Sequence, residues 1–145
     1  MSRHYLAIVF AVIVGFISIA PQVLAIFSLG GEYKGINLLY INDETYYLAR
    51  MRDVLDGHGW ASSPFIYEHK NQRPLMYPSG EYIYAFGSIL FRLPLANVLI
   101  VNKFLFPAVL FFLVYLLISR LTNESGTISH KINAVAGGLF VTLGY

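Results

Sequence analysis

The chain of 145 residues contains no cysteine, only one tryptophan and few charged residues. The absence of cysteine excludes disulfides and thiolate metal sites, and it leaves the redox state of the compartment undetermined. Only 12% of residues are charged, and the ten basic ones are scattered from Arg3 to Lys131. No cationic surface of the kind that binds nucleic acid is therefore expected.

Apolar residues are abundant, at 57% of the chain, which is typical of a membrane protein. The stretch from Tyr5 to Gly31 has 27 residues without a formal charge. A helix of that length exceeds the ~30 Å hydrocarbon core, so we predict a first transmembrane helix, kinked or shortened at Pro21. The alternative is a secretory signal peptide cleaved after Ala25, although the run is longer than the ~7 to 15 residues of a signal core.

A second apolar region holds more than one element. We predict that Ser79 caps a helix with Glu81 in its first turn, and that Pro94 ends this helix. A second span follows at residues 95–120, with Pro107 marking an irregular outer half.

A third apolar segment, residues 132–145, has 14 residues and would reach only about 21 Å as a helix, too little to span a bilayer. We therefore expect the chain to be the N-terminal piece of a larger, all-α polytopic membrane protein. Its predicted parts are a first span (1–31), a loop (32–94) with juxtamembrane helices at about 43–56 and 80–93, a second span (95–120), a short loop (121–131) and a truncated third span (132–145).

The positive-inside rule gives an orientation. Arg3 precedes the first span, while Arg120 and Lys131 flank the connection after the second, which favours the cytoplasm for both ends. The loop 32–94 is then on the external face, most simply of a plasma (inner) membrane.

The first half of that loop is predicted to be an amphipathic helix. Asp43 and Glu44 favour the positive end of a helix dipole, and Gly57 offers the left-handed residue that ends a helix. Apolar residues recur at helical spacing on one side, at Tyr47, Leu48, Met51, Val54 and Leu55, against Arg52, Asp53 and Asp56 on the other. Such a helix is expected to lie flat on the bilayer.

The second half of the loop is rich in proline and aromatic residues, and its charges are Glu68, Lys70 and Arg73. Lysine offers a compact charge and arginine a planar fork of donors, so this stretch suits a phosphate attached to a lipid.

Several of these residues together carry a resemblance: Asp43-Glu44-Thr45-x-Tyr47, a helix containing Ala-Arg, Leu55-Asp56-Gly57-x-Gly59-Trp60, and Tyr67-Glu68-x-Lys70 with Pro74 downstream. Over about residues 43–121 the chain resembles the first external loop of the GT-C superfamily of integral-membrane glycosyltransferases. The likeness is to its aminoarabinose transferase and protein mannosyltransferase branch. These enzymes use sugars linked to lipid phosphates.

The resemblance implies a transferase that moves a sugar from a polyprenyl-phosphate donor to an acceptor hydroxyl. Asp43 would be the general base, with Glu44 and Tyr47 as supporting residues. Glu68 would be a second acid, which in the aminoarabinose transferase branch helps to hold a metal, so a divalent metal is a candidate cofactor. A basic residue would contact the donor phosphate. The family's Glu-Lys-Pro is expanded here, so either Lys70 or Arg73 could be that residue.

Each of these residues also has a structural interpretation. Asp43 and Glu44 could simply be acids at a helix start, and Glu68 could form a surface salt bridge with Lys70 or Arg73. The alternative function is accordingly a non-catalytic membrane component, such as a transporter fragment or an assembly subunit.

Overall fold

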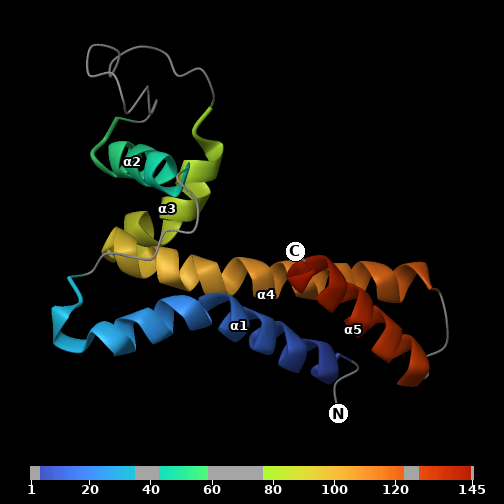
Figure 1. The fold of residues 1–145 in the computed structure, drawn as a ribbon. Coiled ribbons are helices and arrows are strands. Elements are labelled where there is room, and N and C mark those ends of the chain that lie inside the picture. Colours follow the sequence, from blue (N-terminus) through green and yellow to red (C-terminus); the bar gives the residue numbers. More distant parts are fainter. Residues whose placement is uncertain (1–3, 35–42, 59–76, 123–127, 145) are drawn as a thin grey trace. The chain divides into compact units, whose positions relative to one another are not determined.

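The structure is a computed structural model that describes residues 4–34, 43–58, 77–122 and 128–144, and no strand occurs within these ranges. The helices are α1 (Tyr5–Leu29), a 3-10 turn η1 (Gly30–Glu32), α2 (Asp43–Leu55), α3 (Ser79–Phe91), α4 (Leu95–Leu121) and α5 (Ile128–Leu143) (Figure 1). The predicted all-α class is confirmed for the described part of the chain.

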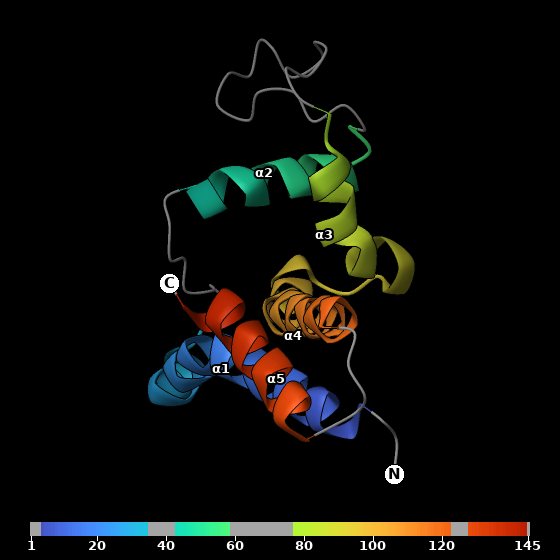
Figure 2. The same ribbon diagram turned by 90° about the vertical axis from the view of Figure 1, so that its right-hand side faces the viewer.

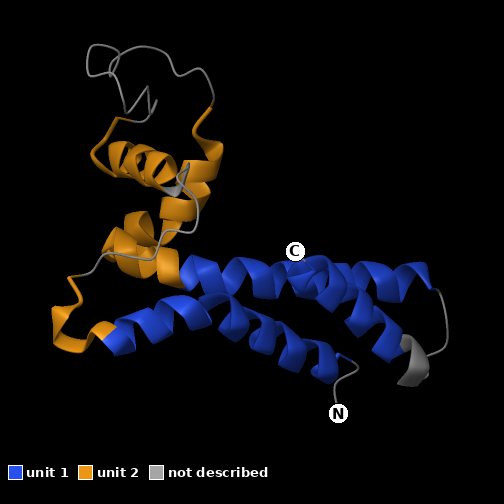
Figure 3. Cartoon of the chain, in the orientation of Figure 1, with its two compact units in different colours: residues 1–28, 101–145 blue, residues 29–100 orange. Residues whose placement is uncertain are grey.

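The chain forms two compact units (Figure 3). Unit 1 comprises residues 1–28 and 101–145, and unit 2 comprises residues 29–100. The first six residues of α4 belong to unit 2 and the rest of that helix to unit 1, so the two units are described separately below.

In unit 1, α1 and α4 run antiparallel. The Nδ1 atom of His4 lies 3.3 Å from the hydroxyl of Tyr115, and the rings of Phe16 and Phe104 meet edge to face with centroids 5.2 Å apart. From His4 to Phe16 the chain advances 12 residues along α1, while from Tyr115 to Phe104, the residues they contact, it goes back 11 residues along α4. The N-terminal end of α1 therefore lies beside the C-terminal half of α4.

Small residues let the three helices of unit 1 approach closely (Figure 2). Ala7, Ala11 and Gly15 recur every four residues on the buried side of α1, and an ideal Cβ built on Gly15 would lie 2.6 Å from the Phe104 ring. From α5, Gly138 meets Phe111 of α4, which is completely buried. Contacts of this small-residue type are typical of helices packed within membranes.

Both prolines of these long helices are accommodated. The helix α1 continues through Pro21 to Leu29, and α4 is continuous through Pro107. A kink or a shortening was expected at Pro21, and α1 is not shortened there. The third apolar helix is α5, which begins at Ile128, inside the predicted loop 121–131. Its first turn contains polar residues, so the apolar pattern of the sequence did not reveal it.

Two described helical segments, Tyr5–Glu32 and Leu95–Leu121, are long and apolar enough to cross a membrane. Only 28% and 17% of their most apolar windows are buried within the protein. A core helix of a water-soluble protein would be mostly buried, so the exposed apolar surface is compatible with insertion into lipid.

In unit 2, α2 packs against α3, as the two views in Figures 1 and 2 show. The predicted cap at Ser79 is wrong: Ser79 is already helical, Pro78 occupies the N-cap position, and its carbonyl accepts the first helical bond from the amide of Tyr82. Proline suits this start because its fixed φ is compatible with a helix and its missing N–H would have no helical partner.

Candidate functional site

The helix α2 begins at Asp43, the predicted catalytic residue. As predicted, α2 ends in a left-handed glycine, Gly57, which has a φ of +90°. The amide of Gly57 donates to the carbonyl of Val54, and the amide of His58 donates to that of Asp53. These two bonds form a Schellman motif, which satisfies the last carbonyls of the helix.

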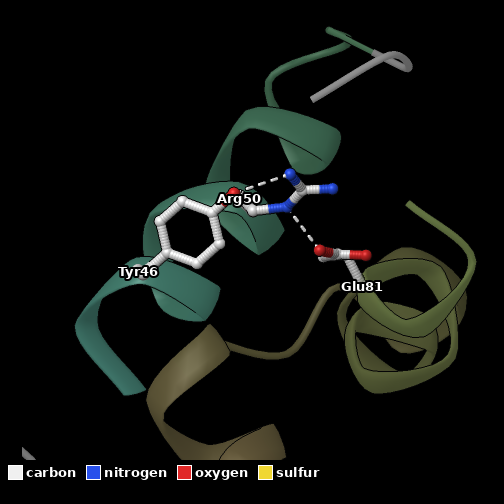
Figure 4. A network of polar contacts seen from close by, with 3 residues as sticks. All are labelled: Tyr46, Arg50 and Glu81. Atoms are coloured by element: carbon white, nitrogen blue, oxygen red, sulfur yellow. Dashed lines mark hydrogen bonds and ion pairs between the residues drawn. The ribbon is translucent and has the colours of Figure 1, made fainter. Parts of the chain in front are cut away.

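A buried ion pair joins α2 to α3. The Nε of Arg50 donates to Oε1 of Glu81, and the two side chains are only 5% and 8% exposed (Figure 4). The Nη1 of Arg50 donates to the hydroxyl oxygen of Tyr46 over 3.0 Å, and the guanidinium also lies 5.4 Å from the centroid of the Tyr46 ring. One residue of α3 and two of α2 thus form a single polar network inside unit 2.

This environment keeps Arg50 charged. Burial, the largest effect, would lower its pKa, but the hydrogen bonds with Tyr46 and Glu81 and the charge of Glu81 outweigh it and raise the pKa above its usual value. A raised folded-state pKa contributes stability that is fully present below the unfolded pKa and is lost only as the pH rises through the folded one. That range is strongly alkaline, so Arg50 is a permanent cation at ordinary pH.

Part of the apolar side predicted for α2 is buried inside the protein. Met51 and Val54 are buried, whereas Tyr47 stays exposed with its ring 5.5 Å from that of Tyr46, edge to face. Arg52 and Asp56 form an exposed ion pair on the predicted polar side. Because Met51 and Val54 are shielded, α2 cannot rest on a bilayer by the whole of its apolar side.

The predicted site residues are only partly located. Asp43 and Glu44 form the first two positions of α2, and Tyr47 lies one turn later. Glu68, Lys70 and Arg73 fall outside the described residues. The expected convergence of Asp43, Glu68 and a cation on one site therefore stays a prediction.

Sequence reasoning missed the role of Arg50 and gave Glu81 only the role of a first-turn acid. A signal was present: Arg50 lies three residues after Tyr47 and four before Val54, within the apolar side of α2. Glu81 is the one charged residue among the 13 of α3. A lone base and a lone acid on two apolar helix faces are candidates for pairing, because each is costly to bury alone.

Within the described ranges, no group of three or more histidine or acidic side chains gathers as a metal would require. The acid that the resemblance associates with a metal is Glu68, which lies outside these ranges. The described residues alone thus do not form a site that fits a divalent cation, and the chemistry considered below uses none.

Comparison of the chain with protein-family models, with curated proteins and with solved structures finds no match. The resemblance to GT-C transferases accordingly depends on the residues quoted from the sequence.

Proposed function

We propose that the chain is part of an integral-membrane glycosyltransferase that moves a sugar from a polyprenyl-phosphate donor to an acceptor hydroxyl. The main support is the order of acids and bases from Asp43 to Arg73, set between two helices long enough to span a bilayer. The site would lie on the external face of the membrane, which is where a lipid-anchored donor could reach it.

In this proposal Asp43 is the general base. Its carboxylate accepts the proton of the acceptor hydroxyl while the hydroxyl oxygen bonds to the anomeric carbon of the sugar. The bond from that carbon to the donor's phosphate oxygen breaks, and the electron pair leaves with the phosphate. Lys70 and Arg73 would stabilise the charge that develops on this leaving group.

The buried ion pair bears on the helix to which position 43 belongs. Position 43 precedes Arg50 by seven residues, so the two positions lie within about 20° of each other around the α2 axis. Since Arg50 is bound to Glu81 of α3, rotation of α2 about its own axis is restricted. A base held by a packed helix keeps its geometry better than one on an unsupported loop.

The test is transfer from a synthetic polyprenyl-phosphate sugar by the full-length protein, comparing Asp43→Asn with the wild type. Loss of a general base is expected to lower turnover by about 10²- to 10⁴-fold. The matched control is Asp56→Asn, which removes an exposed carboxylate near the other end of the same helix and is expected to leave turnover unchanged. Undiminished turnover in Asp43→Asn would remove this residue from the reaction and favour the non-catalytic membrane component.

A further inference from the structure

The core of unit 1 ends in polar side chains where α1 begins, α4 ends and α5 begins, which is one end of this unit (Figures 1 and 2). Ala7 of α1 and Ala134 of α5 are completely buried in one cluster with Tyr115 of α4. His4 lies three residues before Ala7, and Lys131 lies three residues before Ala134. Residues three apart share a face of a helix, so His4 and Lys131 each lie about one turn from the same buried cluster.

Two hydrogen bonds hold His4 at this end. Its carbonyl accepts from the amide of Ile8 over 3.1 Å, so His4 continues the helical pattern of α1. Its Nδ1 lies 3.3 Å from the hydroxyl of Tyr115, a residue that is only 2% exposed. When this hydroxyl donates, Nδ1 is the acceptor, and a neutral imidazole then carries its proton on Nε2. The contact with Tyr115 thus leaves His4 with an N–H that can donate to a further group.

Lys131 lies on the packed side of α5. Ala134 and Val135, three and four residues further on, are buried, whereas the adjacent Ile132 is exposed. Lys131 itself is partly buried and belongs to the first turn of α5. A positive charge in the first turn does not stabilise a helix, because the helix dipole favours negative charge there. The position of this lysine therefore indicates a role in binding an anion and not in stabilising α5.

No acidic residue occurs in the described part of unit 1, which comprises residues 4–28, 101–122 and 128–144. Lys131 and His4 thus meet no carboxylate among these residues. An ammonium group and an imidazole N–H are both donors, and the oxygens of a phosphate accept several hydrogen bonds at once. This end of the unit is accordingly suited to a phosphate group.

The surface beside these donors is apolar. Tyr5, Leu6 and Ile8 of α1 and Ile132 of α5 are all exposed. The helices α1 and α4 are also long and apolar enough to cross a membrane. A ligand that joins a phosphate to acyl chains would satisfy the donors and cover the apolar residues together. Basic pockets between membrane helices bind acidic lipid headgroups in this way.

We propose that Lys131 and His4 bind the phosphate of an anionic phospholipid, while Tyr115 orients the imidazole. The acyl chains would lie against the exposed apolar residues at the start of α1 and of α5. The positive-inside rule predicts that this lipid belongs to the cytoplasmic leaflet. The inference goes beyond the transfer reaction proposed above, because no residue from Asp43 to Arg73 takes part in it.

The test measures lipid retained by the full-length protein in a non-ionic detergent. Native mass spectrometry counts the bound molecules after addition of equal amounts of phosphatidylglycerol and phosphatidylcholine. We expect a preference for phosphatidylglycerol of about fivefold, in line with the attraction of one cation to an anionic lipid surface. Lys131→Gln should abolish the preference and Lys131→Arg should retain it. Tyr115→Phe, which keeps the buried ring, should lower the preference in part.

Arg120→Gln is the matched control. Arg120 is a base near the same end of α4, but it is exposed and lies three residues after the exposed Leu117, on the outer side of the helix. A site formed by Lys131 predicts that Arg120→Gln keeps the full preference. Equal losses in Arg120→Gln and Lys131→Gln would show only a diffuse attraction of bases to anionic lipid and would overturn the site.

Two further measurements separate the lipid from other partners of Lys131. Displacement of bound phosphatidylglycerol by soluble glycerol phosphate would mean that the site takes a phosphate without acyl chains, contrary to the proposal. Glu124 lies outside the described residues, and pairing of Lys131 with this acid would also contradict it. In that case phosphatidylglycerol would raise the Tm of neither the wild type nor Glu124→Gln. The lipid site predicts that it raises the Tm of both and leaves that of Lys131→Gln unchanged.

Discussion

At the scale of single residues, the two ion pairs of α2 have opposite environments. The side chains of Arg50 and Glu81 are 5% and 8% exposed, whereas those of Arg52 and Asp56 are 68% and 45% exposed. A buried pair is weak evidence of net stabilisation, because both charges lose their hydration. Breaking it by removing one partner is nevertheless costly, since the other charge stays buried without compensation.

We therefore predict that Arg50→Met lowers the free energy of unfolding by about 3–5 kcal/mol, while Arg52→Met lowers it by less than about 1 kcal/mol. Unfolding of the protein in mild detergent, induced by sodium dodecyl sulfate and followed by circular dichroism, measures both. Arg50→Glu combined with Glu81→Arg should recover part of the loss. Equal effects of Arg50→Met and Arg52→Met would show that the buried pair is not needed to hold α2 against α3.

At the scale of elements, the sequence predicted the helices closely where hydrophobic runs and turn residues mark them. The predicted ranges 43–56 and 80–93 became Asp43–Leu55 and Ser79–Phe91, and the helix predicted over 95–120 became Leu95–Leu121. Local signals suffice for this because a left-handed glycine, a proline or a charge-free run acts within a few residues. The first polar turn of α5 was missed because hydropathy detects only the apolar part of a helix.

The contacts between elements could not be predicted in the same way. Arg50 and Glu81 are 31 residues apart, and no spacing rule selects that pair from the other charged residues. The same limit applies to the candidate site. The sequence predicts which residues would form it, whereas a convergence of Asp43 and Glu68 would depend on tertiary structure in residues outside the described ranges.

Helix packing in unit 1 gives a prediction at this scale. An ideal Cβ on Gly138 of α5 would lie 2.8 Å from the fully buried ring of Phe111, while no atom of the described residues lies within 4 Å of such a Cβ on Gly80 of α3. Gly138→Ala should therefore destabilise the protein by about 1–3 kcal/mol, because a buried ring has little room to move. Gly80→Ala should stabilise it by up to about 1 kcal/mol through helix propensity.

Thermal unfolding in detergent compares the two glycine variants directly. Both substitutions add one methyl group to a helix, so propensity alone would stabilise both. A gain in stability for Gly138→Ala would mean that α5 does not pack closely on Phe111.

At the scale of the whole molecule, the antiparallel contacts of α1 and α4 have a consequence for topology. His4 lies beside Tyr115, so if both helices cross a bilayer, residue 4 and the segment after Leu121 emerge on the same side. Arg3, Arg120 and Lys131 are near these ends, and the positive-inside rule assigns such residues to the cytoplasm. The structure of unit 1 thus agrees with the charges in putting both ends on one side, and that this side is the cytoplasm stays a prediction from the charges.

We predict that a maleimide unable to cross membranes, added to intact cells, modifies Asp56→Cys but not Thr122→Cys, and that lysis makes Thr122→Cys reactive. Both native side chains are exposed in the structure, and the chain has no other thiol, so reactivity reports the side of the membrane and not burial. Modification of Thr122→Cys alone in intact cells would mean the reverse orientation. Reaction of both would show that α4, the long apolar helix between the two sites, does not span. A mature N-terminus after Ala25 in mass spectrometry would identify the first helix as a cleaved signal peptide.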